Sequence, residues 1–185
     1  MVDRTNLFDL TGHTALVTGG GYGLGRGLVH GLAAHGATVI GLARSEAALR
    51  ETFSTLGSPH RYIVGDLTKL DSQQQGVLNQ YTFNALTCVA ALGFGDIPPA
   101  VFAAAFNRIE NGGLIAFTIK TDFLDENDRS GFSVLIRRLI AEKALSLAER
   151  ERYTHRVTAD GQALEYEAFI GVKQADIRPE WVVEA

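Results

Sequence analysis

The sequence has very little cysteine. Cys88 is the only one among 185 residues, and it lies within an apolar run. A single cysteine excludes a disulfide within the chain and a metal site built from paired thiols. The five histidines are not spaced as metal ligands are, so no metal site is expected. Because a cysteine in an apolar run usually behaves as a small core residue, we expect a buried thiol.

Long hydrophobic runs and an excess of positive charge are also missing. No apolar segment approaches the roughly 20 residues that a transmembrane helix needs, and the N-terminal segment has no continuous apolar stretch of the signal-peptide kind. The formal net charge of −4 does not supply the basic surface typical of nucleic-acid-binding proteins. We therefore expect a cytoplasmic protein whose partner is a small molecule rather than a membrane or a nucleic acid.

Short β-branched runs alternate with segments of helical periodicity along most of the chain. This alternation predicts βαβ units, and hence an α/β domain with a mostly parallel sheet. A turn at Asp160-Gly161, between two strand-like runs, predicts an antiparallel hairpin at the C-terminus. A length of 185 residues fits one well-buried domain, so we expect residues 1–185 to form a single domain. The strands are predicted at residues 14–18, 38–42, 61–64, 86–92, 114–119, 145–157 and 164–172.

Helices are predicted between these strands from their apolar faces. A short helix is expected within residues 69–83, and Asn111-Gly112-Gly113 is expected to end the helix before the fifth strand. The acidic segment 122–128 is interpreted as a loop that caps the next helix, with Asp128 or Ser130 as the N-cap. The alternative is a contact to substrate or metal at the carboxyl edge of the sheet. The inward positions predicted for the helices after the first and fourth strands are Leu24, Leu28, Leu32, Phe102, Phe106 and Ile109.

A glycine-rich turn, Thr18-Gly19-Gly20-Gly21-Tyr22-Gly23-Leu24-Gly25, follows the first predicted strand. Glycine lets the backbone turn tightly, approach a phosphate and pack the next helix on the sheet. The N-terminus of that helix presents free N–H groups to an anion. The turn therefore predicts a nucleotide-cofactor site around Gly19, Gly23 and Gly25, with Gly21, Tyr22 and Leu24 beside them.

The turn belongs to a longer resemblance. The run TGGGYGLGRGLVHGLAAHGATVIGLAR, followed by Gly65-Asp66-Leu67, resembles the N-terminal half of short-chain dehydrogenases/reductases, including their Thr-Gly-x-x-x-Gly-x-Gly turn. The resemblance covers about residues 7–70. It implies that the three bracketing glycines flank the pyrophosphate of a dinucleotide. It also implies that Asp66 and Leu67 meet the adenine edge.

The end of the second strand bears on the choice between NAD and NADP. In this family a carboxylate there normally holds the ribose 2′-hydroxyl of NAD, whereas this chain has Ala43 and Arg44. An arginine favours a 2′-phosphate, so NADP is preferred over NAD. The alternative for Arg44 is a solvated residue at the start of a helix.

The catalytic residues of that family are absent from this sequence. Its members carry an Asn-Asn-Ala-Gly segment after the fourth strand, and a catalytic Ser, Tyr and Lys with the last two spaced as Tyr-x-x-x-Lys, in which the phenol acts as acid or base. Here no tyrosine is followed four residues later by lysine, and the fourth-strand segment reads Val89-Ala90-Ala91-Leu92-Gly93. The resemblance therefore implies cofactor binding without reductase chemistry.

From about residue 83 to residue 175 the chain resembles the C-terminal half of class I S-adenosylmethionine-dependent methyltransferases. The resemblance rests on FNALTCVAALGFGDIPP, NGGLIAFTIK, DFLDENDRSGF and YEAFIGVK. It implies a Rossmann-like doubly wound sheet of strand order 3-2-1-4-5-7-6. Ala90 and Ala91 would border the cofactor cleft, with Asp96 as a candidate catalytic residue. However, the acidic residues that S-adenosylmethionine sites generally want are replaced here by Ala43-Arg44 and Val17-Thr18.

The two resemblances meet between Asp66 and Phe83, as in a natural fusion, a recombined gene or an engineered chimera. Three hypotheses follow: an NADP- or NAD-binding protein without reductase chemistry, a methyltransferase acting on a small molecule, and a folded chimera that binds no ligand. We expect a monomer, because the helices after the fourth strand, through which reductases often pair, are methyltransferase-like here. The substrate is not predictable.

Overall fold

A computed structural model of the chain describes residues 8–95 and 97–182. The chain forms two compact units that divide between Tyr81 and Thr82. The single-domain expectation stays a prediction. Asp96, the candidate catalytic residue of the methyltransferase resemblance, lies outside the described residues.

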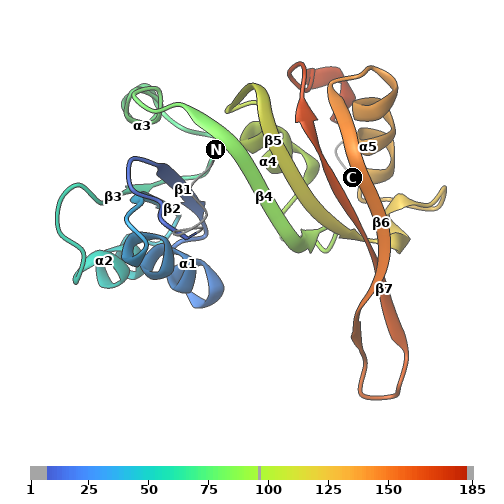
Figure 1. Cartoon of the computed structure of the whole chain (residues 1–185), viewed down its shortest axis with the longest axis horizontal. Coiled ribbons are helices and arrows are strands. Elements are labelled where there is room, and N and C mark those ends of the chain that lie inside the picture. The colour runs from blue at the N-terminus through green and yellow to red at the C-terminus, as the bar shows by residue number, and fades with distance from the viewer. Residues whose placement is uncertain (1–7, 96, 183–185) are drawn as a thin grey trace, which may run out of the picture. The chain divides into compact units, whose positions relative to one another are not determined.

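The first unit is a three-stranded parallel sheet with helices (Figure 1). Its strands are β1 (Thr14–Thr18), β2 (Thr38–Ala43) and β3 (Arg61–Val64), hydrogen-bonded in the order β1-β2-β3. Its helices are α1 (Gly23–Ala34), α2 (Glu46–Phe53) and α3 (Ser72–Leu78). The short helix expected within residues 69–83 is therefore present as α3.

Local signals start two of these helices. The side chain of Ser45 accepts a hydrogen bond from the Ala48 N–H at the start of α2. Asp71 and Gln74 form a capping box at the start of α3, each accepting from the backbone N–H of the other. Both helices therefore begin where a side-chain oxygen satisfies a backbone donor that lacks an intrahelical partner.

Helix α1 packs on its sheet through a different face from the predicted one. Val29 is fully buried in the core with Val39 and Leu49, whereas Leu24 is 90% exposed and Leu28 is 56% exposed. The expectation that Leu24 and Leu28 point inward is therefore wrong for this structure. The reason is that α1 carries apolar residues on more than one side, and sheet contact is made by the side that holds Val29.

Gly27, inside α1, provides a test of helix propensity. A Cβ atom placed on Gly27 would have no atom within 4 Å. Because glycine in a helix interior costs about 1 kcal/mol relative to alanine, we expect Gly27→Ala to raise the free energy of unfolding by about that amount. Urea denaturation measures it. Gly41→Ala is the control with the opposite expectation, since its Cβ would lie 2.5 Å from the Phe53 ring. A lower urea midpoint for Gly27→Ala than for the wild type would contradict the exposed position of Gly27 on α1.

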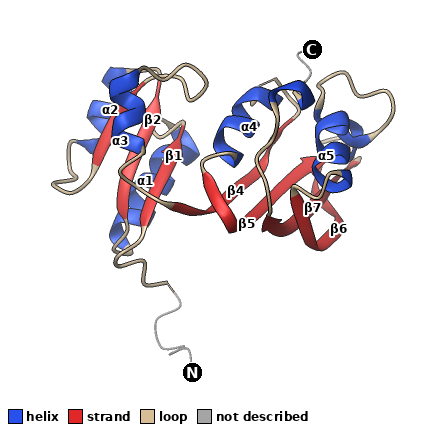
Figure 2. Ribbon diagram, turned by 90° about the horizontal axis from the view of Figure 1, so that it is seen from above, coloured by secondary structure: helices blue, strands red, loops and turns tan. Residues whose placement is uncertain are grey.

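The second unit is a four-stranded mixed sheet with two helices on one face (Figure 2). Its strands are β4 (Phe83–Leu92), β5 (Ile109–Lys120), β6 (Leu145–Val157) and β7 (Ala163–Lys173), in the order β4-β5-β7-β6. Strands β4 and β5 are parallel, and β7 runs antiparallel to both β5 and β6. The helices are α4 (Pro99–Phe106) and α5 (Phe132–Ala141), with short 3₁₀ helices η2 (Thr121–Leu124) and η3 (Pro179–Trp181).

Aromatic side chains fill the space between this sheet and its helices. Phe117 of β5 stacks on Phe169 of β7 at 4.8 Å between ring centroids. Phe102 of α4 meets the edge of Phe117 at 5.2 Å and lies 6.1 Å from Phe132 of α5. The core of the second unit therefore lies on the helix-covered face of its sheet.

The Rossmann-like α/β fold class and the C-terminal hairpin are confirmed. Each sheet has the strand order that the prediction gives for its strands, with β3-β2-β1 in the first unit and β4-β5-β7-β6 in the second. Within the described ranges, no helix is long and apolar enough to cross a membrane.

The boundary between α4 and β5 differs from the prediction. Ile109 begins β5 instead of ending a helix, and the Asn111-Gly112-Gly113 segment lies inside that strand. Gly112 has a φ of +89°, and a Cβ on Gly113 would lie 2.8 Å from the Asn84 carbonyl oxygen of β4. The glycines therefore serve an irregularity in the β4–β5 pairing, where the register shifts between Phe83 and Ala85.

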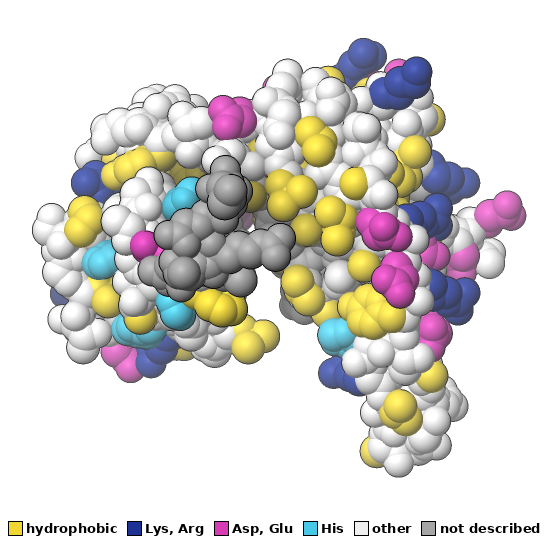
Figure 3. All heavy atoms as spheres, in the orientation of Figure 1, with side chains coloured by type: hydrophobic (Ala, Val, Ile, Leu, Met, Phe, Trp, Pro, Cys, Tyr) yellow, Lys and Arg dark blue, Asp and Glu magenta, His cyan; other side chains and the backbone are white. Residues whose placement is uncertain are grey.

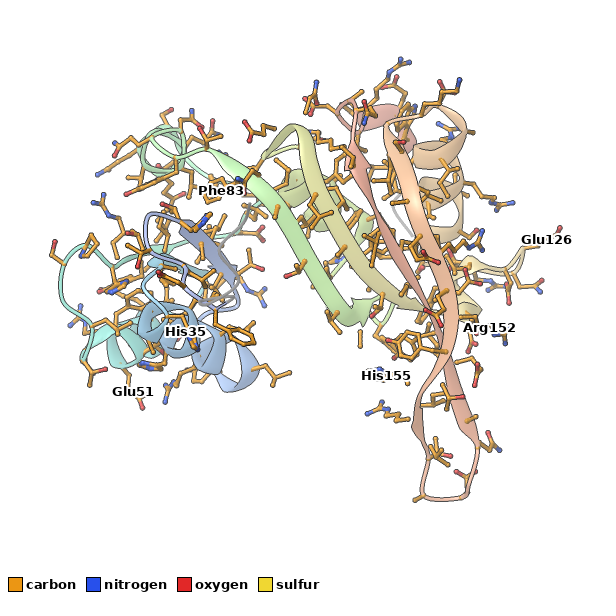
Figure 4. The ribbon with its side chains drawn as sticks, viewed as in Figure 1. His35, Glu51, Phe83, Glu126, Arg152 and His155 are labelled. Atoms are coloured by element: carbon orange, nitrogen blue, oxygen red, sulfur yellow. The ribbon has the colours of Figure 1, made fainter. Side chains whose placement is uncertain are left out.

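The acidic loop before α5 caps that helix through Asp128. Its Oδ2 atom accepts from the Ser133 N–H at 2.9 Å, and its Oδ1 atom accepts from the Ser130 hydroxyl at 2.6 Å. The N-cap position itself is Gly131, in the left-handed conformation. The expected capping by the loop is thus present, although neither predicted residue occupies the N-cap. Glu126 lies on the outer part of this loop (Figure 4).

Candidate nucleotide site

The carboxyl ends of β1, β2 and β3 bring most of the predicted site residues to one edge of the first sheet. The three strands are parallel neighbours, so the loops that follow them open on the same side. The glycine-rich turn follows β1, Arg44 follows β2, and Asp66 with Leu67 follows β3. In open α/β sheets, ligands bind at this edge.

The glycine turn uses backbone conformations that favour glycine. Gly19 has a φ of +69° and Gly23 a φ of +48°, and no atom lies within 4 Å of a Cβ placed on either residue. The open space beside both residues is what a closely approaching phosphate requires. The Gly19 N–H donates to the Leu42 carbonyl of β2 at 2.8 Å, which fixes the turn to the sheet.

Gly25 is required for a different reason. A Cβ at this position would lie 2.1 Å from the Gly19 carbonyl oxygen and 2.7 Å from the Gly19 carbonyl carbon. The first turn of α1 therefore passes directly against the end of β1. Only a residue without a side chain permits this approach.

The N-terminus of α1 is open toward an anion. Its first N–H groups have no intrahelical acceptors, and the N-cap residue Tyr22 provides no side-chain cap to the helix. Its hydroxyl instead lies 3.4 Å from Ser45 Oγ. The first turn carries no acidic side chain, so the positive end of the helix dipole is not neutralised locally.

Two polar residues hold the carbonyl of Gly21. Thr52 of α2 donates its hydroxyl to this oxygen at 3.0 Å, and Arg26 of α1 donates through Nε at 3.3 Å. Arg26 also pairs with Glu51 at 3.0 Å, and Figure 4 shows Glu51 on α2. The glycine turn is thus fastened to α2 as well as to α1.

Sequence reasoning missed Arg26 and Thr52. The available signal was the position of Thr52, which occupies the buried stripe of α2 together with Ala48, Leu49 and Phe53. Thr52 is 1% exposed, and a buried hydroxyl on such a stripe needs a hydrogen-bond acceptor. Here that acceptor is the glycine turn.

Arg44 lies directly after β2 and is exposed, next to Ser45 at the start of α2. A guanidinium here is free to reach a group at the carboxyl edge of the sheet. Hydrogen bonds from Thr68 are the main cause of the lowered pKa of Asp66, and the charge of Arg44 makes a smaller contribution in the same direction. Arg44 and Asp66 therefore belong to the same electrostatic environment.

Asp66 is held by Thr68. Its Oδ1 atom accepts from the Thr68 N–H at 2.9 Å and from the Thr68 hydroxyl at 2.7 Å. These hydrogen bonds lower the pKa of the Asp66 carboxyl, and the charges of Lys69 and Arg44 lower it further. The carboxylate is therefore ionised at neutral pH and oriented through one oxygen. Leu67, the next residue, is buried.

Thr68→Val tests the cause of this lowered pKa. The substitution removes the hydroxyl donor and keeps the N–H donor, so we expect the pKa of Asp66 to rise toward its ordinary value. In the wild type, the stabilising effect of the ionised Asp66 is present above its unfolded-state pKa and is lost as the pH falls through the lower folded-state pKa. As the pH falls, the variant should lose this stabilising effect at a higher pH than the wild type does. Carboxyl-carbon NMR titration measures the pKa of Asp66 in both proteins.

Asp160 is the internal reference in the same spectra. Thr158 lowers the pKa of this carboxyl through a hydrogen bond, and Thr68→Val does not touch it. An unchanged titration midpoint for Asp66, or an equal change at Asp160, would show that the Thr68 hydroxyl is not the cause.

The remaining predicted site residues, Ala90 and Ala91, belong to the second unit. They lie near the carboxyl end of β4, where Ala90 has a φ of +51° and donates its N–H to Thr118 Oγ1 at 2.8 Å. Cys88 of the same strand is only partly buried, which corrects the expectation of a fully buried thiol. Burial still raises its pKa to about 11, so it is protonated at neutral pH.

Comparison of sequences places the first unit near a dehydrogenase family. The sequence model of the short chain dehydrogenase family matches residues 13–82. The cis-1,2-dihydrobenzene-1,2-diol dehydrogenase of Pseudomonas putida is 39% identical over 109 residues, which cover 54% of this chain and 40% of that enzyme. The chain thus spans less than half of the length of this relative.

Comparison of structures gives methyltransferases as neighbours over most of the chain. An N-methyltransferase, NodS, from Bradyrhizobium japonicum WM9 has a TM-score of 0.53 at 13% identity, covering 92% of this chain and 90% of that one. A structure from Listeria monocytogenes assigned as an S-adenosylmethionine dependent methyltransferase has a TM-score of 0.56 at 15% identity, covering 90% and 93%. At such identities the likeness shows the fold alone. The chain therefore resembles short chain dehydrogenases in sequence over residues 13–82 and has the Rossmann-like fold of S-adenosylmethionine-dependent methyltransferases over most of its length.

Proposed function

We propose that this chain binds NADP, and NAD more weakly, through the carboxyl edge of its first sheet, and that it has no reductase chemistry of its own. The observation that carries this proposal is the glycine turn. It combines open space at Gly19 and Gly23 with an uncapped helix N-terminus directly after β1. Such a turn provides backbone N–H groups and a positive dipole end for a diphosphate.

The other residues at this edge take separate parts in the proposal. Gly25 allows α1 to approach β1, so that the first helical N–H groups point at the pyrophosphate. Asp66 is ionised and accepts from the adenine 6-amino group, because both of its described hydrogen bonds engage Oδ1 and Oδ2 remains available. Leu67 packs beside the adenine ring.

Arg44 carries the preference for NADP. An arginine forms paired, charge-assisted hydrogen bonds with a phosphate. A 2′-hydroxyl offers it no negative charge, and the segment from Ala43 to Ser45 offers no carboxylate for such a hydroxyl. The exposed guanidinium after β2 therefore supports NADP over NAD.

A bound nicotinamide would supply a hydride acceptor or donor. The chain's own residues do not supply the proton transfer that reductases of this type require, because no tyrosine is paired with a lysine at Tyr-x-x-x-Lys spacing. The proposed function is accordingly binding of the dinucleotide without turnover of a hydroxyl or carbonyl substrate.

A methyltransferase is the second candidate. Its support is the fold likeness to methyltransferases over about nine-tenths of the chain, together with the C-terminal motifs. Against it stand Ala43 and Arg44, where a carboxylate for the ribose hydroxyls of S-adenosylmethionine is wanted.

Calorimetric titration of the full chain with NADP, NAD and S-adenosylmethionine tests these alternatives. We expect NADP to bind most tightly and NAD more weakly. Binding of S-adenosylmethionine alone would reject the proposal in favour of the methyltransferase, and methyl transfer from labelled cofactor would then support that function. Absence of binding by all three would identify a folded chain without a cofactor.

A further inference from the structure

Taken by itself, the second unit has one sheet face that none of its described helices covers. Helices α4 and α5 both lie on the face that carries Phe117 and Phe169 (Figure 2). Successive side chains of a strand point to opposite faces, so Leu114, Ala116 and Thr118 of β5 belong to the other one, which we call the open face. Parallel strands such as β4 and β5 normally have both faces covered. The open face is therefore exceptional for this part of the sheet.

The strand register defines the open face. Across β5, β7 and β6, the first row is Leu114, Val172 and Ser146, and the second is Ala116, Ile170 and Glu149. The third row is Thr118, Ala168 and Glu151, and the fourth is Lys120, Tyr166 and Tyr153. Ala85 and Thr87 of β4 adjoin the first two rows.

The apolar part of this face is exposed. Val89 of β4 is 65% exposed, Leu114 is 48% exposed and Ile170 is 40% exposed. Figure 3 shows hydrophobic side chains gathered on this face, with acidic side chains beside them. An apolar patch with a polar rim marks an interaction site.

The rim on β6 is acidic. Glu149 and Glu151 are exposed on the open face, next to Ile170 and Ala168 respectively. Arg150 and Arg152 lie on the opposite side of the strand, where Arg150 pairs with Glu167 and Arg152 with Glu165. Figure 4 shows Arg152 and His155 on this strand. Neither Glu149 nor Glu151 has an ion-pair partner among the described residues.

We propose that the open face docks an amphipathic helix of a partner protein, with the apolar stripe of the helix over Leu114 and Ile170 and a row of lysine or arginine facing Glu149 and Glu151. The rows from Leu114 to Thr118 span ~13 Å, which about nine residues of helix would cover. A helix is about 10 Å wide, which matches roughly two strand spacings.

A second copy of the chain is a poorer occupant. Two copies related by a two-fold axis would present the same face to each other. The one cation in the four rows given above is Lys120, which already pairs with Asp122. Arg156 lies on the same face beside Leu164, further along the hairpin from Glu149 and Glu151. Glu149 and Glu151 would then be covered without a counter-charge, which is costly.

Binding of two synthetic helical peptides to the full chain tests the proposal. Both peptides have 15 residues and the same leucine stripe, which is flanked by lysine in one peptide and by glutamate in the other. We expect the lysine peptide to bind and the glutamate peptide not to bind. The amide signals of Leu114, Ala116 and Ile170 should shift in NMR spectra. The double variant Glu149→Lys/Glu151→Lys should lower the affinity for the lysine peptide by about tenfold. It should also allow the glutamate peptide to bind.

Glu126→Lys/Glu142→Lys is the matched control, because it makes the same change of net charge at exposed sites away from this face. It should leave both affinities unchanged. Four results would overturn the proposal: no binding, equal binding of both peptides, equal weakening in the control variant, or self-association of the chain that Ile170→Lys abolishes.

Discussion

Gly25→Ala should lower the affinity for NADP by on the order of a hundredfold, which corresponds to about 2.8 kcal/mol. The added Cβ would lie 2.1 Å from the Gly19 carbonyl oxygen, so either the end of β1 or the first turn of α1 must move. That movement displaces the N–H groups proposed to face the diphosphate. It also strains the packed turn, and overpacking of this kind costs about 1–3 kcal/mol of stability. Calorimetric titration measures the first effect and urea denaturation the second.

Gly27→Ala separates this clash from a general effect of alanine in α1. It introduces the same side chain into the same helix, at a position with open space. We expect unchanged NADP affinity in this control. If Gly25→Ala retained the wild-type affinity, the close approach of α1 to β1 would not be needed for binding. If both variants lost affinity equally, the cause would lie in the helix and not in the turn.

Arg44→Asp should reverse the cofactor preference. Hydrogen bonds to charged groups each contribute about 1.5–3 kcal/mol of free energy. Removing the guanidinium should therefore lower the affinity for NADP by roughly ten- to a hundredfold. The new carboxylate repels the 2′-phosphate and accepts from the 2′-hydroxyl of NAD, so NAD should bind more tightly than in the wild type. Parallel titrations with both cofactors measure the change in their ratio.

Arg61→Asp is the control for net charge. Arg61 is exposed at the beginning of β3, at the other end of the strand from Asp66. The Arg61→Asp variant should change the ratio of the NADP and NAD affinities little. Equal weakening of NADP and NAD in Arg44→Asp would mean that Arg44 acts on the dinucleotide as a whole, and the assignment of its 2′-phosphate role would be wrong.

The strands of the first unit were predictable because each is a short β-branched run bounded by turn residues. The predicted residues 14–18 and 61–64 coincide with β1 and β3. The α4–β5 boundary was not predictable, because Asn111-Gly112-Gly113 looks locally like a helix end. Its actual role depends on Asn84 in the neighbouring strand, which no local pattern reveals.

The same distinction applies to the candidate site. The glycine turn is contiguous in sequence, so its geometry at Gly19 and Gly23 follows from the residues themselves. Arg26 and Thr52 act on this turn across a sequence separation that only the tertiary structure closes. The exposure of Leu24 was also missed, since periodicity identifies apolar faces but does not say which face meets the sheet.

The anchored Gly21 carbonyl has a consequence for the energetics of recognition. Thr52 and Arg26 fix the shape of the turn through contacts within the protein itself. A loop that becomes ordered only in the complex loses conformational freedom and so weakens association. Here that loss is already incurred during folding. Helix α2, which supplies Thr52, thus contributes to affinity through the rigidity it imparts, at a position that need never touch the dinucleotide.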